Sequence, residues 1–136
     1  MKYKQRFFLF ALLNLLPFSA WACDCICAPS TPPENYGHAY VVALVRADGS
    51  DPDDKVFRGL EVVRSWKRKL PERIDVTSME FAMCGYYIGK GVHLLYLSRS
   101  IDGRLETRGC VGNQYETSEY FREHIDWLEK FGALPE

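Results

Sequence analysis

Three of the chain's five cysteines fall within five residues, at Cys23, Cys25 and Cys27, directly behind a segment typical of export signals. That segment, residues 1–22, begins with basic residues, continues with an apolar stretch and ends in the Ala-x-Ala pattern that a signal peptidase requires. Cleavage after Ala22 makes Cys23 the first residue of the mature protein. Because exported proteins fold in an oxidising compartment, we expect disulfides to hold this N-terminus against a distant part of the fold.

The remaining segment, residues 23–136, is long enough for one domain with a single core. All 18 acidic residues but only 14 of the 17 basic residues lie after Ala22, so the mature chain has a net charge of −4. This charge argues against nucleic acid or an anionic membrane as the main partner. The apolar run of the signal segment is shorter than the roughly 20 residues of a membrane span. We therefore expect an exported protein, periplasmic or secreted, with no membrane span.

The odd number of cysteines leaves the state of Cys23 open. At least one of the five cysteines is unpaired, lipidated or bonded to another chain. A lipid on Cys23 would anchor the protein to a membrane. The bulky Trp21 fits a lipoprotein signal poorly, so the sequence favours ordinary cleavage over this lipid anchor.

The patterns of the mature chain predict a small antiparallel barrel. Residues 39–46 are apolar on both faces, which is typical of a strand that is covered on both sides. In the next strand, alternation puts Leu60, Val62 and Trp66 on one face. The strands predicted after the first are 56–67, 73–77, 92–98 and 105–108. Five short strands without βαβ alternation indicate a mainly β fold, a five-stranded OB-fold-like closed barrel.

The segments before and after the first strand are predicted to contain turns. Residues 28–33 are predicted to be an extended proline-rich lead-in, followed by a turn at 34–37. The acidic stretch 48–54 is predicted to be a hairpin tip, because it lacks the ligand spacing and the closing Glu of a calcium loop.

A C-terminal helix follows the last strand. Either Thr117 or Ser118 can cap it, and Gly132 can end it. The residues that recur at helical spacing are Phe121, His124, Ile125, Leu128 and Phe131. We expect Phe121, Ile125 and Leu128 to pack under the barrel as a plug.

The sequence contains no constellation typical of an enzyme. It lacks Gly-x-Ser-x-Gly, His-Glu-x-x-His and a phosphate-binding glycine loop. The clustered thiols with His38 and His93 could bind a metal, but their Cys-x-Cys spacing differs from that of structural zinc sites, and an oxidising compartment consumes free thiols. His93 and His124 fall in apolar patterns and are predicted to be packed core histidines. We expect a protein that is not an enzyme and carries no cofactor.

Several motifs follow one another in a recognisable order. They are the N-terminal Cys-x-Cys, a strand ending in Trp66-Lys67, Cys84-Gly85 with Gly91 before an apolar strand, and Thr107-Arg108-Gly109-Cys110 before a helix. In this order they resemble the netrin-like superfamily of the tissue inhibitors of metalloproteinases (TIMP-like), and its small bacterial members in particular. The resemblance extends from Cys23 to about Phe131. It implies an OB-fold barrel whose two N-terminal cysteines are bonded to the two later ones.

The bacterial members carry Cys-x-Cys-Ala-Pro, which matches residues 25–29 of this chain. The resemblance therefore implies the disulfides Cys25–Cys84 and Cys27–Cys110, with Cys23 left over.

In the animal inhibitors of this superfamily, the amino group and carbonyl of the first cysteine chelate the catalytic zinc of a metalloprotease, and the next side chain enters the specificity pocket. The resemblance thus implies inhibitory, protein-binding residues at Cys23, Asp24 and Cys25. If Cys23 is the ligand to a target's zinc, Asp24 is the side chain that faces the pocket. If Cys25 takes that role, two extra residues precede it and displace the zinc-binding amine. The leading hypothesis is an exported protein-binding domain that inhibits a zinc metalloprotease. The alternative is a non-inhibitory structural or interaction module of the cell envelope, tethered as a lipoprotein through Cys23.

Overall fold

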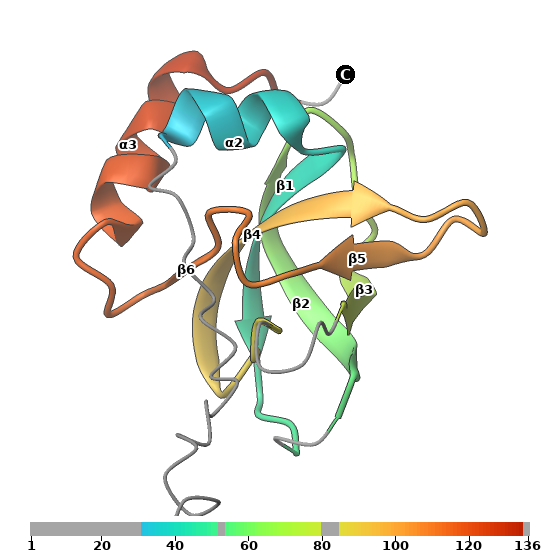
Figure 1. The fold of residues 1–136 in the computed structure, drawn as a ribbon. Helices are drawn as coiled ribbons and strands as arrows, with labels where there is room; N and C mark the ends of the chain where they lie inside the picture. Colours follow the sequence, from blue (N-terminus) through green and yellow to red (C-terminus); the bar gives the residue numbers. More distant parts are fainter. Residues whose placement is uncertain (1–30, 52–53, 80–84, 135–136) are drawn as a thin grey trace, which may run out of the picture.

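The computed structural model describes residues 31–51, 54–79 and 85–134. These residues form two helices and six strands (Figure 1). In chain order they are α2 (Pro32–His38), β1 (Val41–Ala47), β2 (Val56–Trp66), β3 (Arg73–Ser78), β4 (Gly91–Arg99), β5 (Leu105–Thr107), β6 (Gln114–Tyr115) and α3 (Phe121–Phe131).

Five of the strands close into a barrel. The hydrogen-bonded order is β1-β2-β3-β5-β4, and β4 pairs with β1 to complete the circle. Among the pairings described, β3 with β5 is parallel, with Val76 opposite Leu105, and the others are antiparallel. The closed order confirms the predicted mainly β fold, an OB-fold-like barrel followed by a C-terminal helix. The sequence did not predict β6, a two-residue strand on β4.

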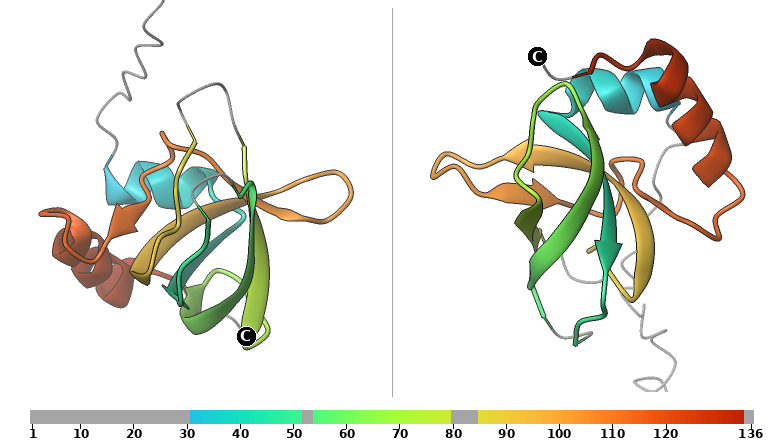
Figure 2. Two further views of the ribbon diagram at one scale, coloured as in Figure 1. Left: turned by 90° about the horizontal axis from the view of Figure 1, so that it is seen from below. Right: turned by 180° about the vertical axis from the view of Figure 1, so that it is seen from behind.

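The barrel has one apolar cluster inside and a second one outside. Successive residues of β1 alternate between them: Val41 and Ala43 pack in the interior, whereas Val42 packs outward. This confirms that the strand is covered on both sides. The outer cluster lies beneath α2 and α3, which are side by side against the outside of the barrel (Figure 2). Leu128 of α3 belongs to this outer cluster, so the prediction that the helix plugs the barrel from below is wrong.

A β-bulge in β2 redirects its side chains. The register with β1 shifts after Leu44, which leaves Val63 as an extra residue on β2. Val62 precedes the bulge and contacts the interior cluster, whereas Trp66 follows it and packs in the outer cluster. The prediction that Leu60, Val62 and Trp66 share one face is therefore wrong, because simple alternation does not hold across a bulge.

A second register shift lies between Phe57 and Leu60, and it brings both side chains into the interior. Gly59, between them, has a φ of +63°, a conformation that glycine adopts without steric cost. Its N–H donates to the Asp75 carboxylate at 2.8 Å, and its carbonyl accepts from Arg73 at 3.0 Å.

Residues 34–37, predicted to be a turn, belong to α2. Pro32 and Pro33 stand at the first helical positions, where a missing N–H costs no hydrogen bond, so the expected extended lead-in does not reach them. The Glu34 carboxylate accepts hydrogen bonds from the N–H and the hydroxyl of Thr31 at 2.9 and 3.0 Å. These bonds lower the pKa of Glu34 and fix the start of the helix.

The C-terminal helix starts later than predicted. Tyr120, not Thr117 or Ser118, stands at the N-cap position of α3. The hydroxyl of Ser118 accepts the Tyr120 N–H at 3.3 Å, so Ser118 supports the turn that leads into the helix. Gly132 follows the last helical residue, as predicted.

Candidate functional site

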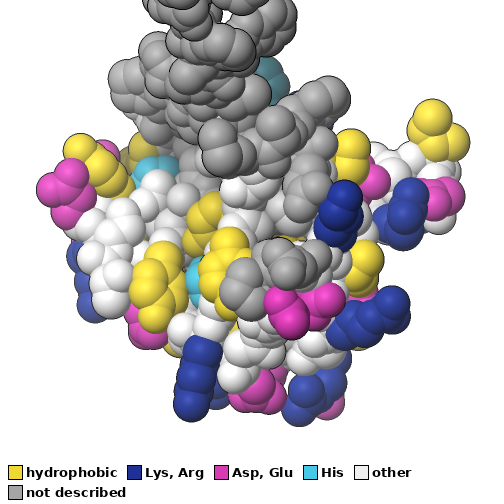
Figure 3. All heavy atoms as spheres, turned by 60° about the horizontal axis from the view of Figure 1, so that its bottom comes forward, with side chains coloured by type: hydrophobic (Ala, Val, Ile, Leu, Met, Phe, Trp, Pro, Cys, Tyr) yellow, Lys and Arg dark blue, Asp and Glu magenta, His cyan; other side chains and the backbone are white. Residues whose placement is uncertain are grey.

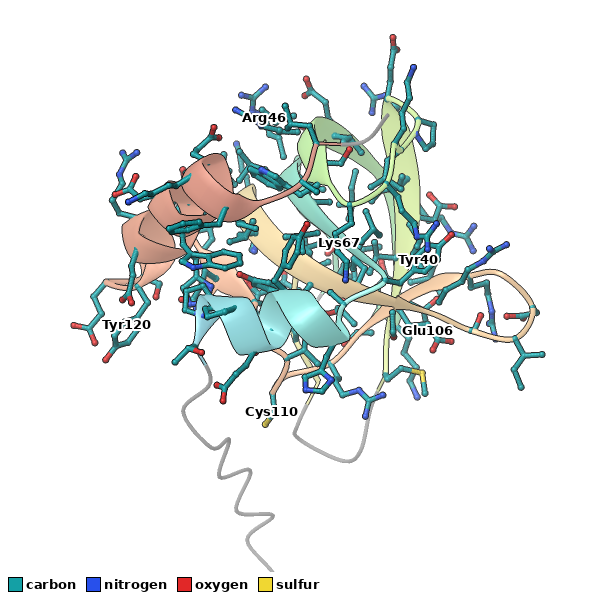
Figure 4. The ribbon with its side chains drawn as sticks, turned by 90° about the horizontal axis from the view of Figure 1, so that it is seen from above. Tyr40, Arg46, Lys67, Glu106, Cys110 and Tyr120 are labelled. Atoms are coloured by element: carbon teal, nitrogen blue, oxygen red, sulfur yellow. The ribbon has the colours of Figure 1, made fainter. Side chains whose placement is uncertain are left out.

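A cavity of about 640 Å³ opens between α2 and the outer side of the β4–β5 pair. Its lining comes from the helix, from the two strands and from the loop after β5, and includes Glu34, Asn35, His38, Ser98, Glu106 and Cys110. Figure 4 shows Glu106 and Cys110 on the same side of the barrel, beside α2. The lining brings carboxylates, a histidine and an exposed cysteine to one opening.

The loop that carries Cys110 is held to the barrel by Asn113. The side-chain oxygen of Asn113 accepts the N–H of Tyr96 at 2.8 Å, and its amide nitrogen donates to Thr107 Oγ1 at 2.6 Å and to the Arg108 carbonyl at 3.1 Å. One side chain thus bonds a backbone N–H of β4, the hydroxyl at the end of β5 and the carbonyl of the residue that follows β5. Cys110 is therefore presented by a loop of fixed shape.

Helix α2 is packed tightly against the same loop. Asn35 is only 7% exposed, and its side-chain amide lies directly against Gly112. Gly112 has a φ of +92°, and a Cβ at this position would overlap the Asn35 amide. The first turn of α2 and the Cys110 loop therefore form one packed unit beside the cavity. Within the described part of the chain, Asn35 Nδ2 has no hydrogen-bond partner.

Two of the three histidines are buried, as predicted. On the outer side of the barrel, His124 Nδ1 lies 2.8 Å from the hydroxyl of Tyr96. His93 Nε2 lies 2.8 Å from the Gly89 carbonyl and therefore donates, so Nδ1 accepts from the Tyr86 hydroxyl at 3.0 Å. Burial lowers the pKa of both histidines, which favours the neutral form.

His93 also stacks on Tyr115, with ring centroids 4.8 Å apart. Tyr115 and Tyr87 are partly exposed. Figure 3 shows hydrophobic side chains gathered at the lower end of the barrel. The packing of both histidines against tyrosines indicates a structural role for them.

Most of the residues predicted for the site lie outside the described residues: Cys23, Asp24, Cys25, Cys27 and Cys84. Cys110 is described, and it is exposed on the rim of the cavity. It is disulfide-bonded to a partner that is not among the described residues, so the pairing implied by the resemblance stays a prediction.

Sequence reasoning missed the cavity and the two asparagines that shape it. One signal was present: Thr31 followed three residues later by Glu34 is a capping-box pattern, and it marks the start of α2. Nothing in the local pattern indicates that Asn35 and Gly112, 77 residues apart, lie in contact.

Within residues 31–51, 54–79 and 85–134, no group of three or more His, Cys, Asp or Glu side chains could hold a metal ion. No helix in the same ranges is long and apolar enough to cross a membrane. No family model matches the chain, and it has no match among curated proteins or solved structures.

Proposed function

We propose that the chain is an exported, netrin-like protein-binding domain that inhibits zinc metalloproteases through its N-terminus, Cys23 to Cys25. Disulfides to Cys84 and Cys110 hold this segment in place. The domain itself is not an enzyme and carries no cofactor, and the zinc belongs to the target protease.

The observation that carries this proposal is the packing of the Cys110 loop against the start of α2. Helix α2 begins directly after Thr31, and Cys27 is only four residues before Thr31. Four residues span at most about 14 Å when fully extended. A Cys27–Cys110 disulfide at the rim of the cavity is therefore compatible with the described geometry, and such a bond would present the residues before Cys27 next to the barrel.

The chemistry requires an unprotonated amine. A neutral α-amino group and a carbonyl oxygen can take the open coordination position of a catalytic zinc. An ordinary α-amino group has a pKa of about 7.7–8.0, so losing its proton near neutral pH is a small penalty. Disulfides that hold the segment reduce the ordering cost of binding. The burial of His93 and His124 against tyrosines supports a binding role over a catalytic one.

The first experiment uses the chain purified after export. N-terminal sequencing and intact mass establish whether Cys23 is the first residue and whether its amine is free. Acetylating that amine, or adding one alanine before Cys23, should abolish inhibition of a zinc protease while the unfolding midpoint stays unchanged.

Asp24 gives a sharper test. A carboxylate entering an apolar specificity pocket pays a desolvation cost, so Asp24→Thr should tighten inhibition. Asp48→Thr, at an exposed loop position, is the matched control and should leave inhibition unchanged. If neither the wild type nor Asp24→Thr inhibits any of a panel of zinc proteases, with the amine confirmed free, the inhibitor proposal is wrong. A lipidated Cys23 would instead support the envelope module.

A further inference from the structure

Two arginines converge on Tyr40, the residue just before β1. The guanidinium carbon of Arg68 lies 4.2 Å from the centroid of the Tyr40 ring, and that of Arg99 lies 5.6 Å from it. Arg99 Nη1 also donates to the Tyr40 hydroxyl at 3.3 Å. The two guanidinium carbons are therefore no farther apart than the sum of their distances to the ring, about 9.8 Å.

The backbone before Arg68 is held in an unusual conformation. Lys67 has a φ of +72°, which is rare for a residue with a side chain. Its N–H donates to the Ala133 carbonyl at 2.8 Å, and its Nζ donates to the carbonyls of Tyr36 at 2.8 Å and Ala39 at 2.5 Å. Figure 4 shows Lys67 and Tyr40 near each other at this end of the barrel. The end of α2 and the C-terminal segment thus fix the turn that places Arg68 over Tyr40.

Neither arginine is neutralised by a carboxylate in the described part of the chain. The ion pairs found there are Arg46–Glu61, Arg64–Glu129 and Arg104–Asp102. Glu106, one register position away from Arg99 on the neighbouring strand, lines the cavity instead. Two positive charges within about 9.8 Å of each other repel, and an anion that contacts both guanidinium groups would relieve the repulsion.

We propose that Tyr40, Arg68 and Arg99 form a binding site for a phosphate group. Guanidinium groups present planar pairs of N–H donors that match phosphate oxygens. Because the Tyr40 hydroxyl accepts from Arg99, its own hydrogen is available to donate to an anion. The two guanidinium groups and the hydroxyl offer more hydrogen-bond donors than the two oxygens of a carboxylate can accept from. A phosphate monoester has three terminal oxygens and a larger charge, so it fits these donors better than a carboxylate does. The site does not depend on the proposed inhibitory function.

The phosphate can come from a soluble molecule or from a lipid headgroup. Ile101, two residues after Arg99, is fully exposed at the tip of the β4–β5 hairpin, which projects from the barrel (Figure 1). Ser100 and Asp102 are hydrogen-bonded within the tip, and Arg104 forms an ion pair with Asp102 at 2.8 Å. Ile101 is an exposed aliphatic side chain on a braced tip two residues from Arg99, and this favours the lipid headgroup as the source.

The test is a titration of the exported chain with inorganic phosphate, followed by NMR shifts of the arginine side chains. We expect saturable shifts of Arg68 and Arg99, and at least tenfold weaker binding in Arg68→Gln and in Arg99→Gln. Arg99→Lys keeps the charge but loses the planar pair of donors. Its affinity for phosphate should lie between that of the wild type and that of Arg99→Gln. Arg122→Gln, an exposed arginine on α3, is the matched control and should bind phosphate as the wild type does. Unfolding midpoints check that the variants remain folded.

Vesicles distinguish the two sources. With vesicles of phosphatidylcholine containing phosphatidic acid, a lipid source predicts binding that Ile101→Ser weakens without changing the phosphate titration. Binding of phosphate without vesicle binding assigns the site to a soluble phosphate ester. The proposal is wrong if phosphate gives no saturable shift, or if Arg122→Gln weakens binding as much as Arg99→Gln does.

Discussion

The two apolar clusters of the molecule differ in what builds them. The interior cluster is formed almost entirely by strand residues that close on one another, such as Val41, Val76 and Leu95. The outer cluster joins strands to helices, and polar contacts accompany it: the Tyr96–His124 hydrogen bond and the bonds from Lys67 to carbonyls at the end of α2, those of Tyr36 and Ala39. From this difference we expect the barrel and the layer of helices to be stabilised separately. The candidate cavity belongs to the outer layer, so perturbing that layer should alter the site before it unfolds the barrel.

The largest effect is expected in the interior. Leu95 is fully buried and pairs with Ala43 across β1 and β4. Leu95→Ala should lower the free energy of unfolding by roughly 3–5 kcal/mol, because the closed barrel cannot collapse onto the cavity left behind. Guanidinium unfolding followed by circular dichroism measures this. A loss below about 1 kcal/mol would contradict a tightly packed interior.

The same substitution in the outer cluster should cost less and act locally. Leu128 is also fully buried, but it lies between a helix and the barrel wall. Leu128→Ala should cost roughly 2–4 kcal/mol, and hydrogen exchange should speed up in α3 while β1 amides keep their protection. If hydrogen exchange speeds up equally in β1, the two clusters unfold as one unit, which contradicts their separate stabilisation.

Gly112 tests the contact that shapes the cavity. Gly112→Ala should destabilise by roughly 1–3 kcal/mol, because the left-handed backbone is strained and the new methyl overlaps Asn35. Repeating the change in an Asn35→Ala background separates the two causes: the overlap disappears and only the backbone strain remains. If the cost is the same in both backgrounds, Asn35 does not pack against Gly112 in solution.

Acidification should act on the outer layer through His124. Burial holds its folded-state pKa below the ordinary 6.5, so the folded state binds fewer protons than the unfolded state once the pH falls below about 6.5. Stability should therefore fall with decreasing pH in that range, by up to about 1.4 kcal/mol per pH unit for each such histidine. His124→Gln should remove its share of this slope in unfolding curves at pH 7 and below. Between pH 7.5 and 8.5 the wild type and His124→Gln should differ in free energy of unfolding by a constant amount.

Local patterns predicted the strands whose signal lies in neighbouring residues. The apolar run of β1 and the strands predicted at 73–77 and 92–98, which correspond to β3 and β4, each follow from residues close in sequence. Together they were enough to indicate a closed barrel.

The errors have physical causes. The bulge at Val63 adds one residue without any change in the kinds of side chain, so the sequence gives no sign that Trp66 faces outward. The two prolines of α2 led to the prediction of an extended segment, because proline is common in extended chain. Proline is also favourable at the first positions of a helix, which is where both of them lie. Of the candidate site, only Cys110 was anticipated and is described. The cavity depends on contacts between distant residues, such as Asn35 with Gly112, that no local pattern encodes.

The central claim is that disulfides fasten the N-terminus beside the cavity. Peptide mapping of the exported chain without reduction tests it directly. The account predicts a peptide pair joining Cys27 to Cys110 and another joining Cys25 to Cys84. Finding Cys110 joined to Cys84 would leave the N-terminal segment unattached and would contradict both the proposed arrangement and the inhibitory function built on it.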